Sequence, residues 1–192
     1  MDEDWFLFIF LLAIIFIYLL SYLYKNYYMT KVKSNIDNRT YYVRKLEDAD
    51  KAADLLATIN KKILELINAL DKDDKKYLPL IEGYIPENLR ETYFNDDYKA
   101  YSVNKGNQLA ICIRYKDNSF IDINTIFFVT VHELSHIMTE EYGHTKTFWN
   151  NMKDLLKISI KNNLYNPIDY SESPVNYCEM DINSTPLDKG DL

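Results

Sequence analysis

The apolar residues of the chain form one unbroken run near the N-terminus and several periodic stretches after it. The run, residues 5–24 (WFLFIFLLAIIFIYLLSYLY), contains no charged side chain. A helix of this length spans about 30 Å, the thickness of the hydrocarbon core of a bilayer. The run follows acidic residues and ends in aromatic ones, whereas a cleaved signal peptide starts with basic residues and ends in small ones. The pattern therefore predicts an uncleaved transmembrane anchor in residues 1–24.

The charges that flank this run predict its orientation. No lysine or arginine precedes it, and the basic residues that follow it closely are Lys25, Lys31, Lys33 and Arg39. By the positive-inside rule, the N-terminus lies outside or in a lumen and the rest of the chain is cytosolic. Two glycosylation sequons, Asn38-Arg39-Thr40 and Asn183-Ser184-Thr185, are then expected to stay unmodified.

Residues 25–78 are predicted to form a juxtamembrane linker and an amphipathic helix. Residues 25–44 are polar and rich in tyrosine without a clear period, which indicates the linker. Three- and four-residue spacing of apolar residues then predicts a helix over 46–70. These residues are Leu46, Ala49, Ala53, Leu56, Ile59, Ile63, Ile67 and Leu70. The helix is expected to pack against the domain, with self-association through it as the alternative. A charged, solvated break follows at 71–76.

Three further helices are predicted after this break. Pro86 is placed to open a short helix through residues 87–94. A strongly apolar helix is expected to start at about Asn124 and to end at Gly143, since glycine commonly terminates helices. An amphipathic helix is expected over residues 145–161, because its apolar residues fall on one side.

Strands are predicted on either side of a hairpin-like turn, Asn104-Lys105-Gly106. Residues 101–103 precede this turn, and residues 109–114 follow it with alternating apolar positions. The expected fold class is therefore α+β, with a small antiparallel sheet in a core formed by residues 79–167. Proline punctuates residues 168–192, which predicts an extended, loop-like tail.

Composition excludes some classes of function. Only four glycines occur, and no phosphate-binding glycine pattern is present. The net charge of −7 argues against nucleic acid as a partner, because phosphate binding depends on clustered lysine and arginine. The two cysteines, Cys112 and Cys178, lie far apart, so free thiols and a reducing compartment are expected.

All three histidines of the chain fall in one segment, VHELSHIMTEEYGH (residues 131–144). On a helix, residues four apart differ by about 40° of rotation and about 6 Å of rise, so His132 and His136 can aim at one point. Two imidazoles in this geometry suit a tetrahedral zinc ion. Glu133 is then placed to reach a water on the ion without being a ligand. This division of roles is the physical reason for the HExxH pattern.

A third ligand is needed to hold the ion. Glu140 continues the helical stripe, but it lies about 12 Å along the axis from His132, too far to share one ion. Chain that leaves the helix and turns back must supply the ligand, and Gly143 permits such a turn directly before His144. The alternative, an unpaired buried cluster in a core helix, would cost several kcal/mol.

The segment VHELSHIMTEEYGHTKTFWNNMKDLL resembles the WLM family of zincin metallopeptidases, relatives of the SprT-like proteases. The shared features are a histidine shortly after the HExxH helix and an aromatic pair such as Phe148-Trp149. AYSVNKGNQLAICIR and YNPIDYSESPVNYCEMDI are more specifically similar to WLM-like proteins of large DNA viruses, which often carry an N-terminal membrane segment. The resemblance implies a zincin-like fold, Zn²⁺ held by His132, His136 and His144, and Glu133 as the catalytic base.

The sequence therefore predicts a membrane-anchored zinc metallopeptidase acting on a protein or peptide, in a viral or host membrane. Some WLM relatives act on DNA–protein crosslinks, but the anchor and the acidic balance argue against that role here. A catalytically silent scaffold with the same fold is the alternative function. Asp169, Glu172 and Glu179 are equivalent candidates to orient the histidines. Cys178 is expected to be simply buried, with a zinc-capping thiolate as the alternative.

Overall fold

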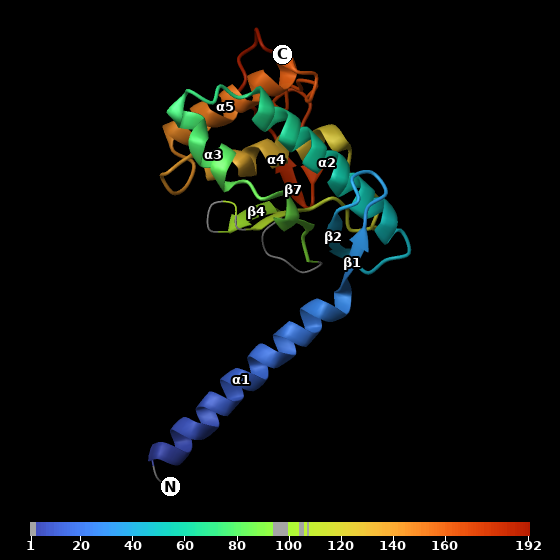
Figure 1. Ribbon diagram of the computed structural model, residues 1–192, viewed down its shortest axis with the longest axis vertical. Helices are drawn as coiled ribbons and strands as arrows, with labels where there is room; N and C mark the ends of the chain where they lie inside the picture. Colours follow the sequence, from blue (N-terminus) through green and yellow to red (C-terminus); the bar gives the residue numbers. More distant parts are fainter. Residues whose placement is uncertain (1–2, 94–99, 104–105, 107) are drawn as a thin grey trace.

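A long N-terminal helix projects from a head that contains the rest of the chain (Figure 1). The computed structural model describes residues 3–93, 100–103, 106 and 108–192. The helix, α1, covers Glu3–Tyr28. Its segment Trp5–Tyr24 has a mean hydropathy of 2.8 and none of it is buried, so among the described residues one helix is long and apolar enough to cross a membrane.

The chain passes from α1 directly into a β-hairpin, so the linker predicted over residues 25–44 is wrong. Strand β1 (Met29–Lys33) pairs antiparallel with β2 (Thr40–Arg44). Tyr41 and Val43 point into the core and are at most 1% exposed, while Thr40 is exposed and Tyr42 is half-buried. Each strand offers only two or three inward positions, which is too short a period to stand out among so many tyrosines.

The head contains a five-stranded sheet in the order β1-β2-β3-β5-β4. The remaining strands are β3 (Leu89–Glu91), β4 (Ala100–Val103) and β5 (Gln108–Ile111). The small sheet is confirmed, as is the antiparallel pairing of β4 with β5; the described part of the turn between them is Gly106. The expectation of a purely antiparallel sheet is wrong, because β3 runs parallel to both β2 and β5. A crossover through a helix connects β2 to β3, which is the connection that parallel strands need.

The helix predicted over residues 87–94 is also wrong in the described part. Pro86 opens a 3-10 turn, η2 (Pro86–Asn88), and the chain then enters β3. Proline fits the first position of either kind of helix, so it did not distinguish them. The chain forms a strand here rather than a helix because β3 pairs with β2 on one side and β5 on the other, and these hydrogen bonds outweigh local propensity. Phe94 lies outside the described residues.

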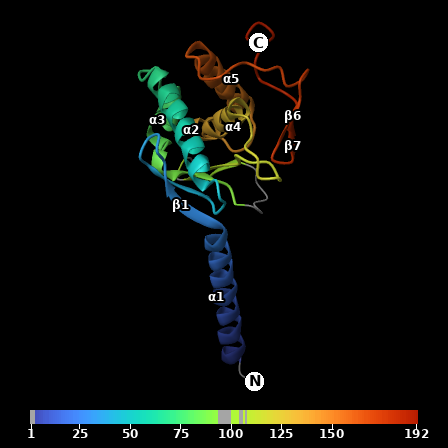
Figure 2. The same ribbon diagram turned by 90° about the vertical axis from the view of Figure 1, so that its right-hand side faces the viewer.

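The helices cover one face of the sheet, opposite the side from which α1 leaves (Figures 1 and 2). They are α2 (Ala49–Ala69), α3 (Leu78–Gly83, entered through the 3-10 turn η1, Lys75–Tyr77), α4 (Ile123–Met138) and α5 (Lys146–Lys161). The helices predicted over 46–70 and 145–161 are confirmed to within three residues. The apolar helix α4 is confirmed too, but it ends at Met138 rather than at Gly143.

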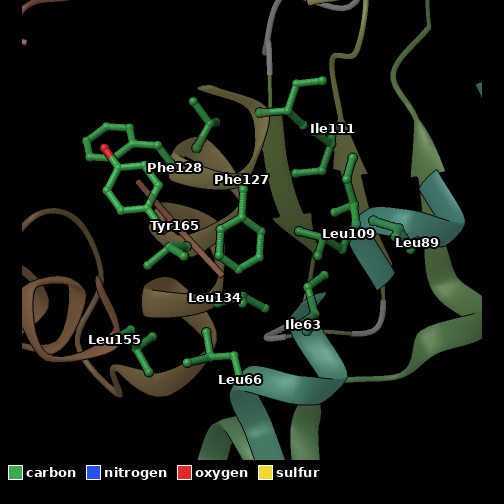
Figure 3. Close-up of a cluster of buried hydrophobic side chains, with 14 of the residues drawn as sticks. Ile63, Leu66, Leu89, Leu109, Ile111, Phe127, Phe128, Leu134, Leu155 and Tyr165 are labelled. Atoms are coloured by element: carbon green, nitrogen blue, oxygen red, sulfur yellow. The ribbon is translucent and has the colours of Figure 1, made fainter. Parts of the chain in front are cut away.

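The hydrophobic core lies between the sheet and this helical layer (Figure 3). Ile63 and Leu66 of α2, Leu109 and Ile111 of β5 and Phe127 of α4 all belong to this core (Figure 3), and all five are at most 1% exposed. Burial of each such side chain stabilises the fold by about 1.5–3 kcal/mol. The apolar face of α2 therefore packs against its own domain.

The C-terminal tail is not wholly extended. It forms a hairpin of β6 (Val175–Tyr177) and β7 (Met180–Ile182). A disulfide between Cys112 and Cys178 joins this hairpin to the end of β5, so the expectation of two free thiols is wrong. The Cα atoms of the pair are 6.5 Å apart although the residues are 66 positions apart in sequence. Only the folded topology brings them together.

Candidate metal centre

Helix α4 carries the first two histidines of the candidate site. Asp122 caps its N-terminus by accepting hydrogen bonds from the backbone N–H groups of Asn124 and Thr125. The last turns then place His132 and His136 one above the other, with ring centroids 5.0 Å apart. This is the placement that the four-residue spacing predicts.

The third histidine reaches the same point after the chain reverses. Gly143 has a φ of +82°, a left-handed conformation that glycine adopts without strain. His144 follows, and its Nε2 lies 3.0 Å from Nε2 of His132. Thr145 secures the turn, because its hydroxyl donates to Glu141 and caps α5 by accepting from the Phe148 N–H. The three predicted ligands are therefore brought together.

The nitrogen donors fit a zinc ion. One ligand atom from each histidine lies within 4.8 Å of the other two, and tetrahedral ligands about 2 Å from zinc lie about 3.3 Å apart. Burial, with contributions from the neighbouring rings, lowers the pKa of His132 to about 3. Burial and His144 lower the pKa of His136 as well. These imidazoles are therefore neutral at pH 7, the form that binds metal.

Aromatic side chains of α5 support the cluster. The buried ring of Phe148 lies 4.4–4.9 Å, centroid to centroid, from each of the three histidine rings. Trp149 packs against the rings of His132 and His144. The aromatic pair that the resemblance singled out thus fixes the orientation of all three imidazoles.

Glu133 lies beside the cluster and is 6% exposed. Burial raises the pKa of its carboxyl group to about 7, and a hydrogen bond from the backbone of Ser102 opposes this. Ser102 belongs to β4, the edge strand of the sheet. The carboxyl group is thus held between helix and edge strand at a pKa near neutrality, which suits a group that both accepts and donates protons.

The three histidines and Glu133 line a cleft of about 710 Å³. Residues 100–102 of β4 form part of its lining, and residues 180–184, in and after β7, form another part. Phe128, Val129 and Met152 make the lining largely apolar. These walls could not be predicted from the sequence, because the pairing of distant strands creates them.

The three acidic residues of the tail that were predicted as candidates to orient the histidines pair with other groups or are exposed. The carboxylate of Asp169 accepts hydrogen bonds from Ser171, and that of Glu179 pairs with Lys116. Glu172 is exposed. Cys178 is buried, as expected, but its sulfur is bonded to Cys112, so the alternative of a zinc-capping thiolate is wrong.

Comparison with known proteins places these features in a family. Residues 35–166 match the family model described as WLM domain. The chain is 35% identical over 164 residues to "uncharacterized protein R325" of Acanthamoeba polyphaga mimivirus, covering 81% of this chain and 83% of that protein. It is 25% identical over 160 residues to "uncharacterized protein 136R" of Invertebrate iridescent virus 6, covering 79% and 88%. The crystal structure of a Wss1 mutant from Saccharomyces cerevisiae aligns with a TM-score of 0.48 and 20% identity, covering 64% of this chain and 91% of that chain.

Proposed function

The chain belongs to the WLM family, and we propose that it is a membrane-anchored, zinc-dependent metallopeptidase. One observation carries the proposal: three imidazole nitrogens converge within 4.8 Å beside a buried glutamate. A structural role alone would not require three histidines to share one point in an open cleft. The remaining coordination position of a three-histidine zinc site would face that cleft, where a peptide can enter.

The residues would divide the work as follows. His132, His136 and His144 would hold the ion, which when bound lowers the pKa of water toward about 7 and polarises a carbonyl group. Glu133 would accept the proton of the attacking water and return it to the leaving amine, because its pKa near 7 suits both transfers. The apolar lining of the cleft would exclude other water and so strengthen these interactions.

The anchor is the second part of the proposal. Helix α1 would span the bilayer through Trp5–Tyr24, since this segment is apolar, of suitable length and not buried. The lysines and Arg39 after it favour a cytosolic head. The substrate would then be a protein or peptide that comes close to the same membrane.

Metal content and cleavage of the full-length chain in neutral detergent test the proposal together. The parent should bind one zinc per chain and cleave members of a peptide library. Glu133→Gln should retain zinc and lose at least about 10²-fold in turnover, because it cannot accept the proton. His144→Ala should lose zinc. Glu140→Gln is the matched control: Glu140 is exposed and outside the cleft lining, so both properties should persist.

Two results would contradict the peptidase. Glu133→Gln cleaving as fast as the parent would remove the proposed base. Stoichiometric zinc in a parent that cleaves no peptide or protein would favour the alternative, a catalytically silent zincin-fold scaffold at the membrane.

A further inference from the structure

Arg90 differs from the other arginines of the chain in its charge partners. Arg39 pairs with Glu87, Arg44 with Glu91, and Arg114 with both Glu91 and Asp48. Arg90 is 8% exposed, and no described carboxylate forms an ion pair with it. A buried guanidinium stays protonated, so its charge needs compensation from another source.

The described groups that contact the guanidinium of Arg90 are neutral. Its Nη1 donates to the hydroxyl of Tyr93 at 2.6 Å, and its Nη2 donates to that of Tyr101 at 2.5 Å. The guanidinium also stacks on the ring of Tyr93, 4.3 Å from its centroid. Its Nε is buried without a hydrogen-bond partner. A guanidinium has five N–H donors, so several remain for a further acceptor.

Strand register places a second cation on the same face as Arg90. Lys31 lies opposite Tyr42, and Tyr42 lies opposite Arg90, so the three side chains share the face that the helices do not cover. On the far side of Arg90, the small Ala110 leaves room for Tyr101 to reach across. A row from a lysine through tyrosine to arginine thus crosses the outer face of the sheet.

This row borders a hollow of about 500 Å³. Lys31, Thr40, Tyr42, Arg90 and Gln108 line it, and all five carry hydrogen-bonding groups. Glu87 is the one acidic residue among its described lining residues, and it is already paired with Arg39 at 2.6 Å. The hollow is therefore positively charged and suited to an anion.

Strands β1 and β2, which contribute Lys31 and Tyr42 to the lining of the hollow, lie on the side of the head from which α1 leaves (Figure 1). Strand β1 begins at the residue after α1, and the Tyr28 carbonyl accepts a hydrogen bond from the Lys45 N–H at 2.8 Å. Burial raises the pKa of Tyr42, and Tyr22 of α1 is close enough to contribute. With Trp5–Tyr24 in the hydrocarbon core, this face meets the headgroup layer, which is about 5–7 Å thick per leaflet.

We propose that this hollow binds the phosphate group of an anionic phospholipid in the leaflet next to the head. Arg90 would supply the buried charge and further N–H donors, and Lys31 would approach the phosphate from the open side. The site would hold the outer face of the sheet against the membrane. The inference requires α1 to span the bilayer but not the peptidase activity, since the hollow and the cleft share no lining residue.

Lipid titration of the full-length chain in neutral detergent, followed by native mass spectrometry, tests the proposal. Short-chain phosphatidic acid should bind one molecule per chain, and phosphatidylcholine of the same chain length should not. Lys31→Gln should weaken phosphatidic acid binding about fivefold, equivalent to about 1 kcal/mol per basic residue near the headgroups. Arg90→Gln should weaken it more. Lys33→Gln is the matched control, because Lys33 lies on the same strand and face but outside the hollow.

Lys31→Gln keeps the test decisive if Arg90→Gln does not fold, because Lys31 is exposed. Equal binding by Lys31→Gln and Lys33→Gln would overturn the site. Inorganic phosphate that displaces the lipid at equal concentration would show that the acyl chains contribute nothing, and would overturn a membrane ligand. An oligonucleotide that binds more tightly than phosphatidic acid, and loses affinity in Lys31→Gln, would also overturn it. Unchanged zinc content and turnover in these variants would separate this site from the proposed peptidase.

Discussion

Removal of the Cys112–Cys178 disulfide should loosen one wall of the cleft without unfolding the head. Cys178 lies in the turn between β6 and β7, and residues 180–184 after it line the cleft. Cys112→Ala/Cys178→Ala removes the bond without leaving buried hydroxyl groups. The hairpin would then be held by burial, chiefly of Tyr177, and by the hydrogen bond from the Tyr177 hydroxyl to the Cys112 carbonyl oxygen at 2.7 Å.

The loss can be estimated from the loops that the bond closes. For global unfolding the loop spans 66 positions, and its closure entropy corresponds to about 4 kcal/mol at 25 °C. For local detachment of the hairpin, the helices stay folded and the relevant loop runs only from the end of α5 to Cys178. A loop of about 15 residues corresponds to about 3 kcal/mol, a factor of roughly 10² in the local opening equilibrium.

Hydrogen exchange of the full-length chain in detergent, read by mass spectrometry, measures this opening. Amides of 175–182 should exchange about 10²-fold faster in the double variant, while those of α4 change far less. The parent reduced at both thiols is the matched control, since it lacks the bond but keeps both sulfur atoms. Equal exchange rates of the hairpin amides in the oxidised parent and the double variant would refute the loop-closure reasoning. The burial of Tyr177 would then be what holds the hairpin in place.

Further predictions concern the metal, the core, acid stability and topology. A chelator should lower the thermal midpoint of the parent but not of His144→Ala; saturation at 1,000 times Kd corresponds to about 4 kcal/mol of lost stabilisation. Phe127→Ala should cost about 3–5 kcal/mol in denaturation, because Phe127 is fully buried, whereas exposed Tyr142→Ala should cost little. Hydrogen bonds from Arg114 lower the pKa of Asp48 below 3.8. The Asp48 carboxylate therefore stabilises the fold above that pH, and this contribution is lost on acidification through the lowered pKa. Acid denaturation of Asp48→Asn should lack this part of the pH dependence. The lysines after α1 predict a cytosolic head in which Asn38 and Asn183 carry no glycan. The disulfide, in contrast, is typical of oxidising compartments. Glycan mass at both asparagines would show that the predicted orientation is reversed.

The parts of the fold that the sequence predicted are those with local causes. Helices α2 and α5 are recognisable from the spacing of apolar residues within one segment, so their bounds are predicted to within three residues. The convergence of His132, His136 and His144 follows from one helical turn and one glycine, all inside 14 consecutive residues. Neither inference needs a partner from elsewhere in the chain.

The parts that it missed depend on distant contacts. Strand β3 has three residues and exists because β2 and β5 leave a place for it on either side. The disulfide needs a pairing across 66 positions, and the hollow around Arg90 needs strands β1, β2, β3 and β5 in register. Even the end of α4 falls five residues before the glycine, because the chain must bend early to return His144 to the histidine cluster.

The immediate passage from α1 into β1 has a mechanical consequence. A protease on a flexible stalk sweeps a large volume and cuts whatever diffuses into it. Here β1 begins at the residue after α1 ends, and the Tyr28 carbonyl accepts a hydrogen bond from Lys45, so no linker separates the head from the helix. The cleft of the proposed peptidase would then lie at a fixed height above the lipid. A target would be selected by the height at which it exposes its backbone as well as by its side chains.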